Sequence, residues 1–326
     1  MKQDKDELVN NLLLSKAQIE SHIAFLPYRG SPMVKEIKGS RYLYVRLREL
    51  GRETMKYVGP YDAQLYLSLA SNYSSYRELR KQLRHVEKDL ALLGYKTSAL
   101  SSNALLNIDF ARAQMKASIY DQAVLEGVAT TFPQTEQILE NGTVSGMTPS
   151  DIQKVLNLKH AWEFILEKDI VSYKTSMGIL KTINKLVEEG IDRSGGSLRS
   201  FPIGITGTSY VPPIPDEKSV KEKIESIVAS KDLPIDKGIE LIAATMKGQY
   251  FKDGNKRTAV IFGNHFLIGK GQGLIIVPYR LVPEFREVLV RYYEGNETEF
   301  HSYLKEKCWF KLQKTKQETD MEKPYA

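Results

Sequence analysis

The stretch covering residues 248–269, GQYFKDGNKRTAVIFGNHFLIG, constrains the fold more than any other part of the chain. Its second half, AVIFGNHFLI, is almost entirely apolar, as expected of a helix that is buried on every face. Gly254 and Asn255 stand directly before this half, where a chain commonly turns into a helix. A buried helix needs other elements to cover it, so the stretch predicts a helical domain with a charged loop at the mouth of a central helix.

The loop residues favour a phosphate site. Gly254 permits close backbone approach, and a helix that begins at Asn255 directs its free N–H groups and positive dipole end at one point. Lys256 and Arg257 add donors for phosphate oxygens, and Asp253 offers a hard oxygen ligand for Mg²⁺. Neither a Walker A nor a GxGxxG pattern is present. The alternative is an ordinary helix start with a solvated Lys-Arg pair.

Most of residues 105–312 reads as one mainly helical domain. Residues 198–213, LRSFPIGITGTSYVPP, are the exception, because apolar residues alternate there and Gly207-Thr208 suits a turn, which predicts an inserted β-hairpin. Ser and Asn residues at 101–103 predict a linker before this domain, and residues 313–326 predict a disordered tail. Helices are predicted at residues 111–127, 149–167, 172–189, 216–230, 234–247, 255–269 and 283–293.

Residues 1–98 predict a separate N-terminal domain. Residues 6–25 favour a helix, residues 32–59 a three-stranded meander, and residues 61–93 a long helix with a leucine seam. The two helices are expected to form an antiparallel hairpin that flanks the small sheet. Pairing between two chains along the same seam, giving a homodimer, is the alternative.

Basic charge is concentrated in the meander. Residues 29–57 hold eight Lys or Arg against three Glu, a surplus of five beside a whole-chain formal charge of +6. Cations interleaved with tyrosines can contact nucleic-acid phosphates and bases, whereas a solvated basic sheet is the plainer interpretation. The residues concerned are Arg41, Arg46, Arg48 and Lys56, with Tyr42, Tyr44 and Tyr57.

Composition restricts the class of protein. A chain of 326 residues with 42% hydrophobic and 26% charged residues can form a substantial core. The start, MKQDKDELVNNLLL, carries acids among its lysines and only a short apolar run, which favours neither a signal peptide nor a membrane span. The single cysteine, Cys308, lies outside any His/Cys cluster and is predicted to be a buried apolar residue. A cytoplasmic protein is therefore expected.

FKDGNKRTA, at residues 251–259, resembles the signature loop of the Fic/Doc (Fido) family, His-Pro-Phe-x-Asp/Glu-Gly-Asn-Gly/Lys-Arg. Every specified position from Phe251 to Arg257 fits. Residues 197–213 resemble the family's flap, residues 154–165 resemble a core helix that precedes it, and VLEGVATT at residues 124–131 is similar to the stretch with the inhibitory glutamate. These likenesses cover about two thirds of the chain.

The resemblance implies a mainly helical fold with a β-hairpin flap. It also implies transfer of AMP from ATP to a Ser, Thr or Tyr hydroxyl of a target protein or of the chain itself. Some relatives transfer other phosphate-containing groups. The implied site residues have these roles: Asp253 holds Mg²⁺; Gly254, Asn255 and Lys256 hold the α-phosphate; Arg257 binds the outer phosphates; Thr206, Gly207 and Thr208 line the nucleotide pocket; and Glu126 is the inhibitory candidate.

Three residues depart from the family pattern. Gln249 stands where the motif histidine accepts the proton of the attacking hydroxyl, and an amide is far too weak a base for that role. Val260 and Gln122 replace an arginine and a Ser or Thr of the inhibitory pattern, so an ordinary helix-end carboxylate is the alternative for Glu126. Two functions stay open: a transferase that is slow by nature or altered at residue 249, and a nucleotide-sensing regulatory or nucleic-acid-binding protein.

Overall fold

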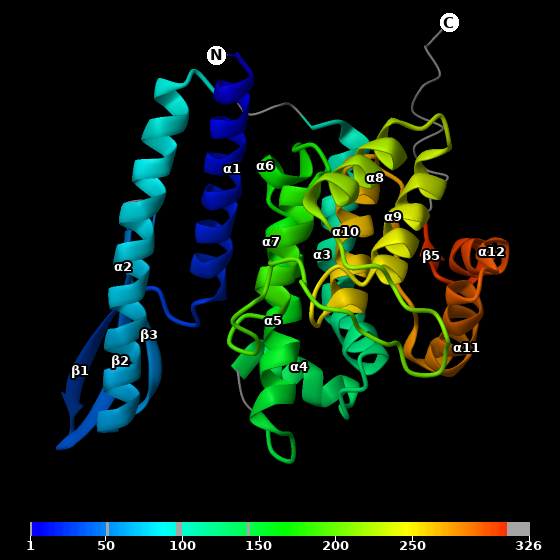
Figure 1. The fold of residues 1–326 in the computed structure, drawn as a ribbon. Helices are drawn as coiled ribbons and strands as arrows, with labels where there is room; N and C mark the ends of the chain where they lie inside the picture. The colour runs from blue at the N-terminus through cyan, green and yellow to red at the C-terminus, as the bar shows by residue number, and fades with distance from the viewer. Residues whose placement is uncertain (1, 50–51, 96–99, 142–143, 312–326) are drawn as a thin grey trace, which may run out of the picture. The chain divides into compact units, whose positions relative to one another are not determined.

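The computed structural model describes residues 2–49, 52–95, 100–141 and 144–311, and the chain divides into two compact units, Met1–Thr97 and Ser98–Ala326 (Figure 1). The expected tail at residues 313–326 lies outside the described residues. No helix within the described ranges is long and apolar enough to cross a membrane.

The N-terminal unit is a helical hairpin combined with a three-stranded sheet, as predicted. Strands β1, β2 and β3 pair antiparallel in chain order, and β2 is central. Helices α1 and α2 pack together through Ile19, Ile23 and Leu83. The elements are α1 (Lys2–Phe25), β1 (Ser31–Ile37), β2 (Ser40–Glu49), β3 (Arg52–Pro60) and α2 (Ala63–Leu92).

The sheet alternates between a core face and an outer face. Leu43 and Val45 of β2 are buried against Leu69 of α2, which leaves the intervening tyrosines on the opposite face. There, the rings of Tyr44 and Tyr57 meet edge to face at 5.4 Å. Regular alternation therefore explains the tyrosine positions.

The basic residues of the meander are not all on the outer face of the sheet. The guanidinium of Arg41 lies 4.2 Å from the ring of Tyr61, and the ammonium of Lys56 lies 5.7 Å from the ring of Tyr28. Both rings pack against the cluster on the core face. The side chain of Arg48 lies outside the described part of the chain. The suggested nucleic-acid contact therefore stays a prediction, with its cations spread over two faces.

The C-terminal unit is mainly helical, and α10 is its central helix. All but two of the fifteen residues of α10 are buried, and it packs against α9, α7, α3 and α5 (Figure 1). The elements are α3 (Ser102–Leu125), α4 (Phe132–Asn141), α5 (Pro149–Ile165), α6 (Lys168–Val171), α7 (Met177–Val187), α8 (Glu217–Ala229), α9 (Pro234–Gly248), α10 (Asn255–Gly269), β4 (Leu274–Ile275), η1 (Tyr279–Leu281), α11 (Val282–Tyr293), α12 (Glu297–Lys307) and β5 (Trp309–Phe310).

Two local predictions for this unit are wrong. The expected linker at residues 101–103 is the start of α3, because the Ser101 hydroxyl accepts a hydrogen bond from the amide of Ala104 at 3.2 Å and so caps the helix. The helix expected at residues 172–189 is shorter in the structure, where α7 spans Met177–Val187 and the separate short helix α6 ends at Val171. Cys308 is buried, as predicted, and burial raises the pKa of its thiol to about 12.

Candidate functional site

The loop between α9 and α10, residues 249–254, is held by two residues in left-handed backbone conformation. Gln249 ends α9 with φ 44°, and Gly254 begins α10 with φ 73°. A methyl group at Gly254 would clash with the carboxylate of Glu188, so this position requires glycine on two counts. The loop is therefore a tight, fixed connection between two packed helices.

Asn255 shapes this loop from within. Its Oδ1 accepts a hydrogen bond from the amide of Phe251 at 3.0 Å, and its Nδ2 donates to the carbonyl of Phe251 at 2.7 Å. Asn255 is itself buried. The side chain of Asn255 was predicted to hold a phosphate, whereas in the structure it closes the loop from which α10 begins.

The N-terminus of α10 begins without a side-chain cap. Gly254 supplies no side-chain cap, and the first intrahelical bond runs from the amide of Thr258 to the carbonyl of Gly254. The preceding amides of the first turn therefore have no helical acceptor, and the helix dipole adds partial positive charge there. Lys256, at the same turn, lines the adjoining cavity. Together these groups favour a phosphate or another anion.

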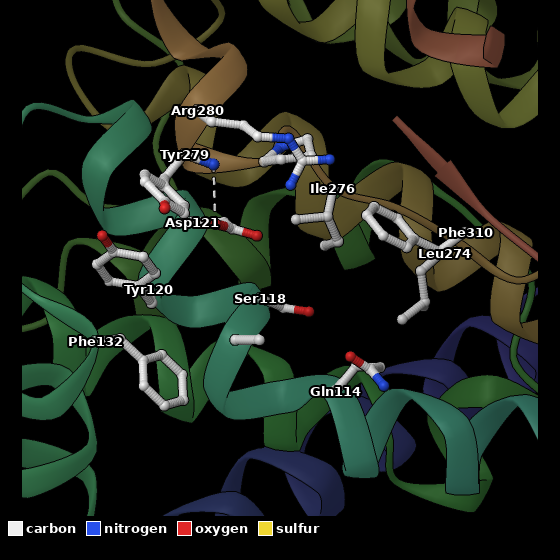
Figure 2. A pocket seen from close by; sticks show the side chains of 12 residues that line it. Gln114, Ser118, Tyr120, Asp121, Phe132, Leu274, Ile276, Tyr279, Arg280 and Phe310 are labelled. Atoms are coloured by element: carbon white, nitrogen blue, oxygen red, sulfur yellow. Dashed lines mark hydrogen bonds between the residues drawn. The ribbon is translucent and has the colours of Figure 1, made fainter. Parts of the chain in front are cut away.

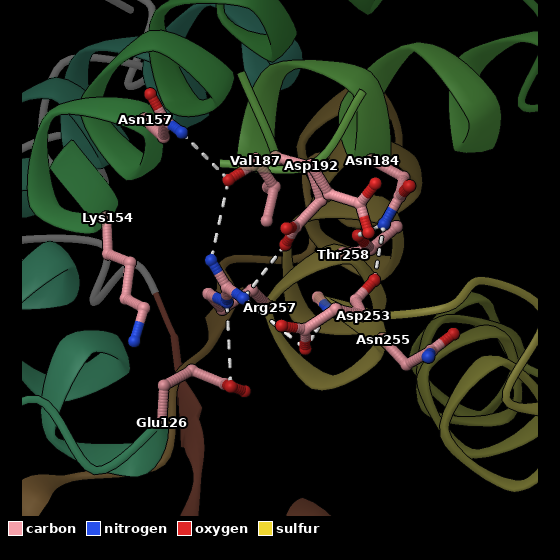
Figure 3. Close-up of polar contacts among 12 residues, drawn as sticks. Glu126, Lys154, Asn157, Asn184, Val187, Asp192, Asp253, Asn255, Arg257 and Thr258 are labelled. Atoms are coloured by element: carbon pink, nitrogen blue, oxygen red, sulfur yellow. Dashed lines mark hydrogen bonds and ion pairs between the residues drawn. The ribbon is translucent and has the colours of Figure 1, made fainter. Parts of the chain in front are cut away.

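Arg257 belongs to the first turn of α10, and its side chain lies in a buried cluster of charged groups (Figure 3). Its side chain is 2% exposed, and its Nη2 lies 2.9 Å from Oε1 of Glu188. Its Nε lies 3.5 Å from Oε2 of Glu126, and Nη2 lies 3.7 Å from Oδ1 of Asp253. Nη1 also donates to the carbonyl of Val187 at 3.4 Å. The guanidinium is thus held in place by three carboxylates and one carbonyl.

Glu188 was not found by sequence reasoning. Its side chain is 1% exposed, and burial raises its pKa to about 7, although the positive charge of Arg257 opposes that rise. Glu188 caps the C-terminus of α7, where the helix dipole disfavours a negative charge. An acidic residue at the C-terminus of an apolar helix is unfavourable, and this feature of the sequence could have pointed to Glu188. The structure explains its position by the ion pair with the buried Arg257.

Glu126 reaches the same cluster from α3, where it is the C-terminal cap. It lies 3.8 Å from the ammonium of Lys256 in addition to its contact with Arg257. Gln122, one turn earlier, donates from Nε2 to the carbonyl of Arg257 at 2.8 Å and accepts from Nε1 of Trp162 at 3.1 Å. The structure therefore brings the 124–131 stretch to the start of α10.

The segment at residues 198–213 differs from the paired hairpin that the sequence predicts. It contains a turn at Thr206 and Gly207 but no strand residues. We call it the flap. Thr206 lines the site cavity, Gly207 faces Val290, and the Thr208 hydroxyl accepts a hydrogen bond from a nearby flap amide at 3.1 Å. A strand ladder is absent because proline residues at 202, 212 and 213 remove donors.

Arg199 holds the base of the flap, and the sequence analysis did not identify it. The side chain is buried, and its nitrogens donate to main-chain carbonyls at both ends of the flap. The acceptors are Gln249 at 2.6 Å, Phe201 at 2.7 Å, Pro213 at 2.6 Å and Pro212 at 3.2 Å. One side chain therefore joins the flap to the loop that precedes α10.

Gln249 faces the same cavity. Its Nε2 donates to the carbonyl of Met246 at 2.7 Å, and its side chain also hydrogen-bonds the buried Tyr293, where it opposes the rise in the tyrosine pKa caused by burial. Its carboxamide can orient a hydroxyl group, but it cannot accept a proton near neutral pH. As Gln249 stands, the site lacks a neutral-range base at that position.

The cavity has a volume of about 390 Å³ and lies between the flap, the loop and α11. Asp253 lines it with a side chain that is 61% exposed, and its Oδ1 accepts a hydrogen bond from the amide of Gly254 at 2.6 Å. A single accessible carboxylate beside an anion site fits Mg²⁺ that is shared with substrate phosphates. The arrangement suits binding of a magnesium-complexed polyphosphate.

Residues 175–267 match a family model described as Fic/DOC family. A fragment of Fic-1 from C. elegans is 21% identical with a TM-score of 0.51, covering 74% of this chain and 73% of that chain. A Fic domain containing signaling protein from Bacteroides thetaiotaomicron is 19% identical with a TM-score of 0.50, covering 64% of this chain and 87% of that chain. The curated proteins gave no match. At these identities, the structural likeness establishes the fold.

Proposed function

From the match of residues 175–267 to the Fic/DOC family model, we propose that the chain is a Fic-type protein adenylyltransferase impaired at its base position. One observation carries the proposal: α10 begins without a side-chain cap beside a cavity lined by Lys256, Gln249 and Thr206 of the flap. That geometry provides for a nucleotide phosphate next to a place for a hydroxyl group.

In the proposed reaction, the oxygen of a protein hydroxyl forms a bond to the α-phosphorus of ATP, and the bond to pyrophosphate breaks. The amides at the start of α10 hold the α-phosphate oxygens, and Lys256, which lines the cavity, faces the outer phosphates. The buried Arg257 contacts them only when it releases a carboxylate partner. Mg²⁺, when bound through Asp253, neutralises phosphate charge. The hydroxyl proton passes to solvent water during the step, because Gln249 cannot accept it.

The missing base sets the expected rate. Loss of a general base typically costs about 10²–10⁴-fold. Phosphoryl-type transfer relies mainly on positioning and electrostatics, so the groups that hold the phosphates are expected to give a residual rate without a base. The backbone at Gln249 suits a histidine as well, because histidine is enriched among residues in the left-handed region and Gln249 has φ 44°.

A nucleotide-sensing protein is the second candidate, and the charge cluster favours it. Arg257 is already paired with Glu188 and Glu126, so a polyphosphate has to compete with these carboxylates for the guanidinium. Glu126 is the inhibitory candidate in either function, because it contacts Arg257 and Lys256 at the mouth of the site. In a sensor, the signal would be the transfer of Arg257 from these carboxylates to the bound nucleotide.

The test compares the chain with its Gln249→His form by intact-mass analysis after incubation with Mg·ATP, alone and in a lysate with labelled ATP. We expect the histidine form to gain one adenylyl group per modified hydroxyl, with a rate about 10²–10⁴-fold above that of the parent chain. A phosphoryl group in place of the adenylyl group would indicate a kinase.

Two controls separate the site from the base. Adding Asp253→Ala to the histidine form should abolish the gain, whereas Lys221→Ala on the exposed face of α8 should leave it unchanged. Equal, negligible modification by the parent and histidine forms would exclude the latent transferase. Calorimetric binding of Mg·ATP to both forms would then support the sensor.

A further inference from the structure

A second cavity, of about 300 Å³, lies on α3 away from the site cavity (Figure 2). It is bounded by α3, by the chain from β4 to η1, and by β5, and it shares no lining residue with the cavity at α10. Its volume lies at the lower end of the range for small-molecule sites, roughly 300–1,000 Å³. The cavity is therefore large enough for one ligand of amino-acid size.

Aromatic rings form one end of this second cavity. The ring centroid of Tyr120 lies 5.3 Å from that of Tyr279 and 5.8 Å from that of Phe132. Phe132, Tyr279 and Phe310 are 40%, 51% and 41% exposed, which is high for large apolar side chains lining a hollow. These rings can cover an apolar or aromatic group and lose their contact with water on doing so.

Polar groups of both charges line the same cavity. Asp121 accepts a hydrogen bond at Oδ1 from the amide of Tyr279 at 2.9 Å, and burial raises its pKa while that amide and Arg280 oppose the rise. Ser118 is only 3% exposed, and Figure 2 shows its hydroxyl directed at the cavity with no bond to the residues drawn. The cavity thus combines a carboxylate, a guanidinium and a buried hydroxyl.

We propose that this second cavity binds a free aromatic amino acid. The ring lies against Tyr120 and Tyr279, the ammonium group donates to Asp121, and the carboxylate pairs with Arg280. A carboxylate and a guanidinium beside aromatic rings match a zwitterion with a planar side chain. Neither a plain amine nor a plain carboxylate uses both charged groups.

The second cavity is connected to the nucleotide site through α3. Asp121 lines the cavity, and the next residue, Gln122, donates to the carbonyl of Arg257. Glu126, at the end of the same helix, contacts Arg257 directly. A ligand that shifts this end of α3 would move Glu126 relative to Arg257, and the amino acid and nucleotide affinities would then be coupled in both directions. This coupling, unlike the binding itself, rests on the proposed function.

The test is calorimetry on the full chain with L-phenylalanine and L-tryptophan. Phenethylamine, which lacks the carboxylate, and 3-phenylpropionate, which lacks the ammonium, are the ligand controls. We expect saturable binding of at least one amino acid and at least tenfold weaker binding of both controls. Asp121→Asn keeps an oxygen for the Tyr279 amide, and Arg280→Gln changes an exposed side chain, so both variants should fold.

Each variant should weaken binding about tenfold or more, while Arg112→Gln, exposed on α3 and outside the cavity, should not. Absence of binding by both amino acids at millimolar concentration would overturn the proposal, as would binding indifferent to Asp121→Asn and Arg280→Gln. Unchanged Mg·ATP affinity at saturating amino acid would overturn the coupling alone. Amino acid binding without any nucleotide binding would instead count against the proposed function.

Discussion

The loop before α10 and the flap border the same cavity, but they are held in different ways. The loop is closed from inside by Asn255, fixed by the backbone of Gly254 and anchored by the buried Arg257. The flap has no strand ladder, and Arg199 joins its two ends to the loop. The start of α10 is therefore fixed by its own loop, whereas the flap is joined to that loop at its base and packs through Tyr210 against Tyr293.

The largest expected effect tests how firmly Arg257 anchors the loop. Arg257→Met leaves the buried carboxylate of Glu188 without its cation, which should lower the free energy of unfolding by about 3–5 kcal/mol. Denaturant unfolding measures it. Lys256→Met is the matched control, because the ion pair of Lys256 with Glu126 spans 3.8 Å at a half-buried side chain and is worth roughly 0–1 kcal/mol. Equal losses in both variants would contradict the anchoring role.

The next effect compares a glycine in each region. Gly254→Ala adds a clash with the buried Glu188 to the strain of φ 73°, whereas Gly207→Ala in the flap, with φ 88°, meets only Val290 at 3.7 Å. We expect a loss of about 2–4 kcal/mol for the first, from strain and overpacking, and roughly 1–2 kcal/mol for the second, from strain alone. Thermal unfolding would compare them. A larger loss at Gly207 would reverse the proposed order of rigidity.

A smaller, local effect is expected from Arg199→Met. The variant loses all the side-chain hydrogen bonds to the flap base, but the freed carbonyls can turn to water, so the cost should be about 1–3 kcal/mol. Hydrogen exchange should quicken at residues 201–211 and change little at residues 251–255. Arg199→Lys keeps the charge but not the forked geometry, so its stability and its exchange rates in the flap should lie between those of the parent chain and Arg199→Met. Uniform protection of the flap in Arg199→Met would show that other contacts hold it.

The last expected effect is a pH dependence of stability that arises from Glu188, the partner of Arg257. Burial raises the pKa of Glu188 from 4.5 to about 7, so the folded chain holds this proton more tightly than the unfolded chain does. The contribution of Glu188 to stability is then present below pH 4.5 and is lost as the pH rises through about 7. Glu188→Gln should remove this loss, and its melting temperature relative to the parent should rise between pH 5 and pH 8. A relative fall over that range would contradict the raised pKa.

Local patterns allowed the sequence to predict much of the fold. The apolar run fixed α10 at residues 255–269, with the bounds that the structure has, and alternation with turn residues predicted the three strands of the N-terminal sheet. The helix start was predicted at Asn255, directly after Gly254, and the structure gives Gly254 a left-handed φ of 73° that favours glycine. These features depend on neighbours within a few residues, and so a single sequence can show them.

Contacts between distant segments were decided only by the tertiary structure. Glu188 meets Arg257 from a helix almost seventy residues away in the chain, and Arg199 reaches the carbonyl of Gln249 across fifty residues. Asn255 had the residue type for a phosphate contact, yet its amide is used by Phe251. Side-chain chemistry limits which partners are possible, but packing in three dimensions selects one of them. Burial then shifts the pKa of Glu188, because the cost of removing a charge from water depends on what surrounds it.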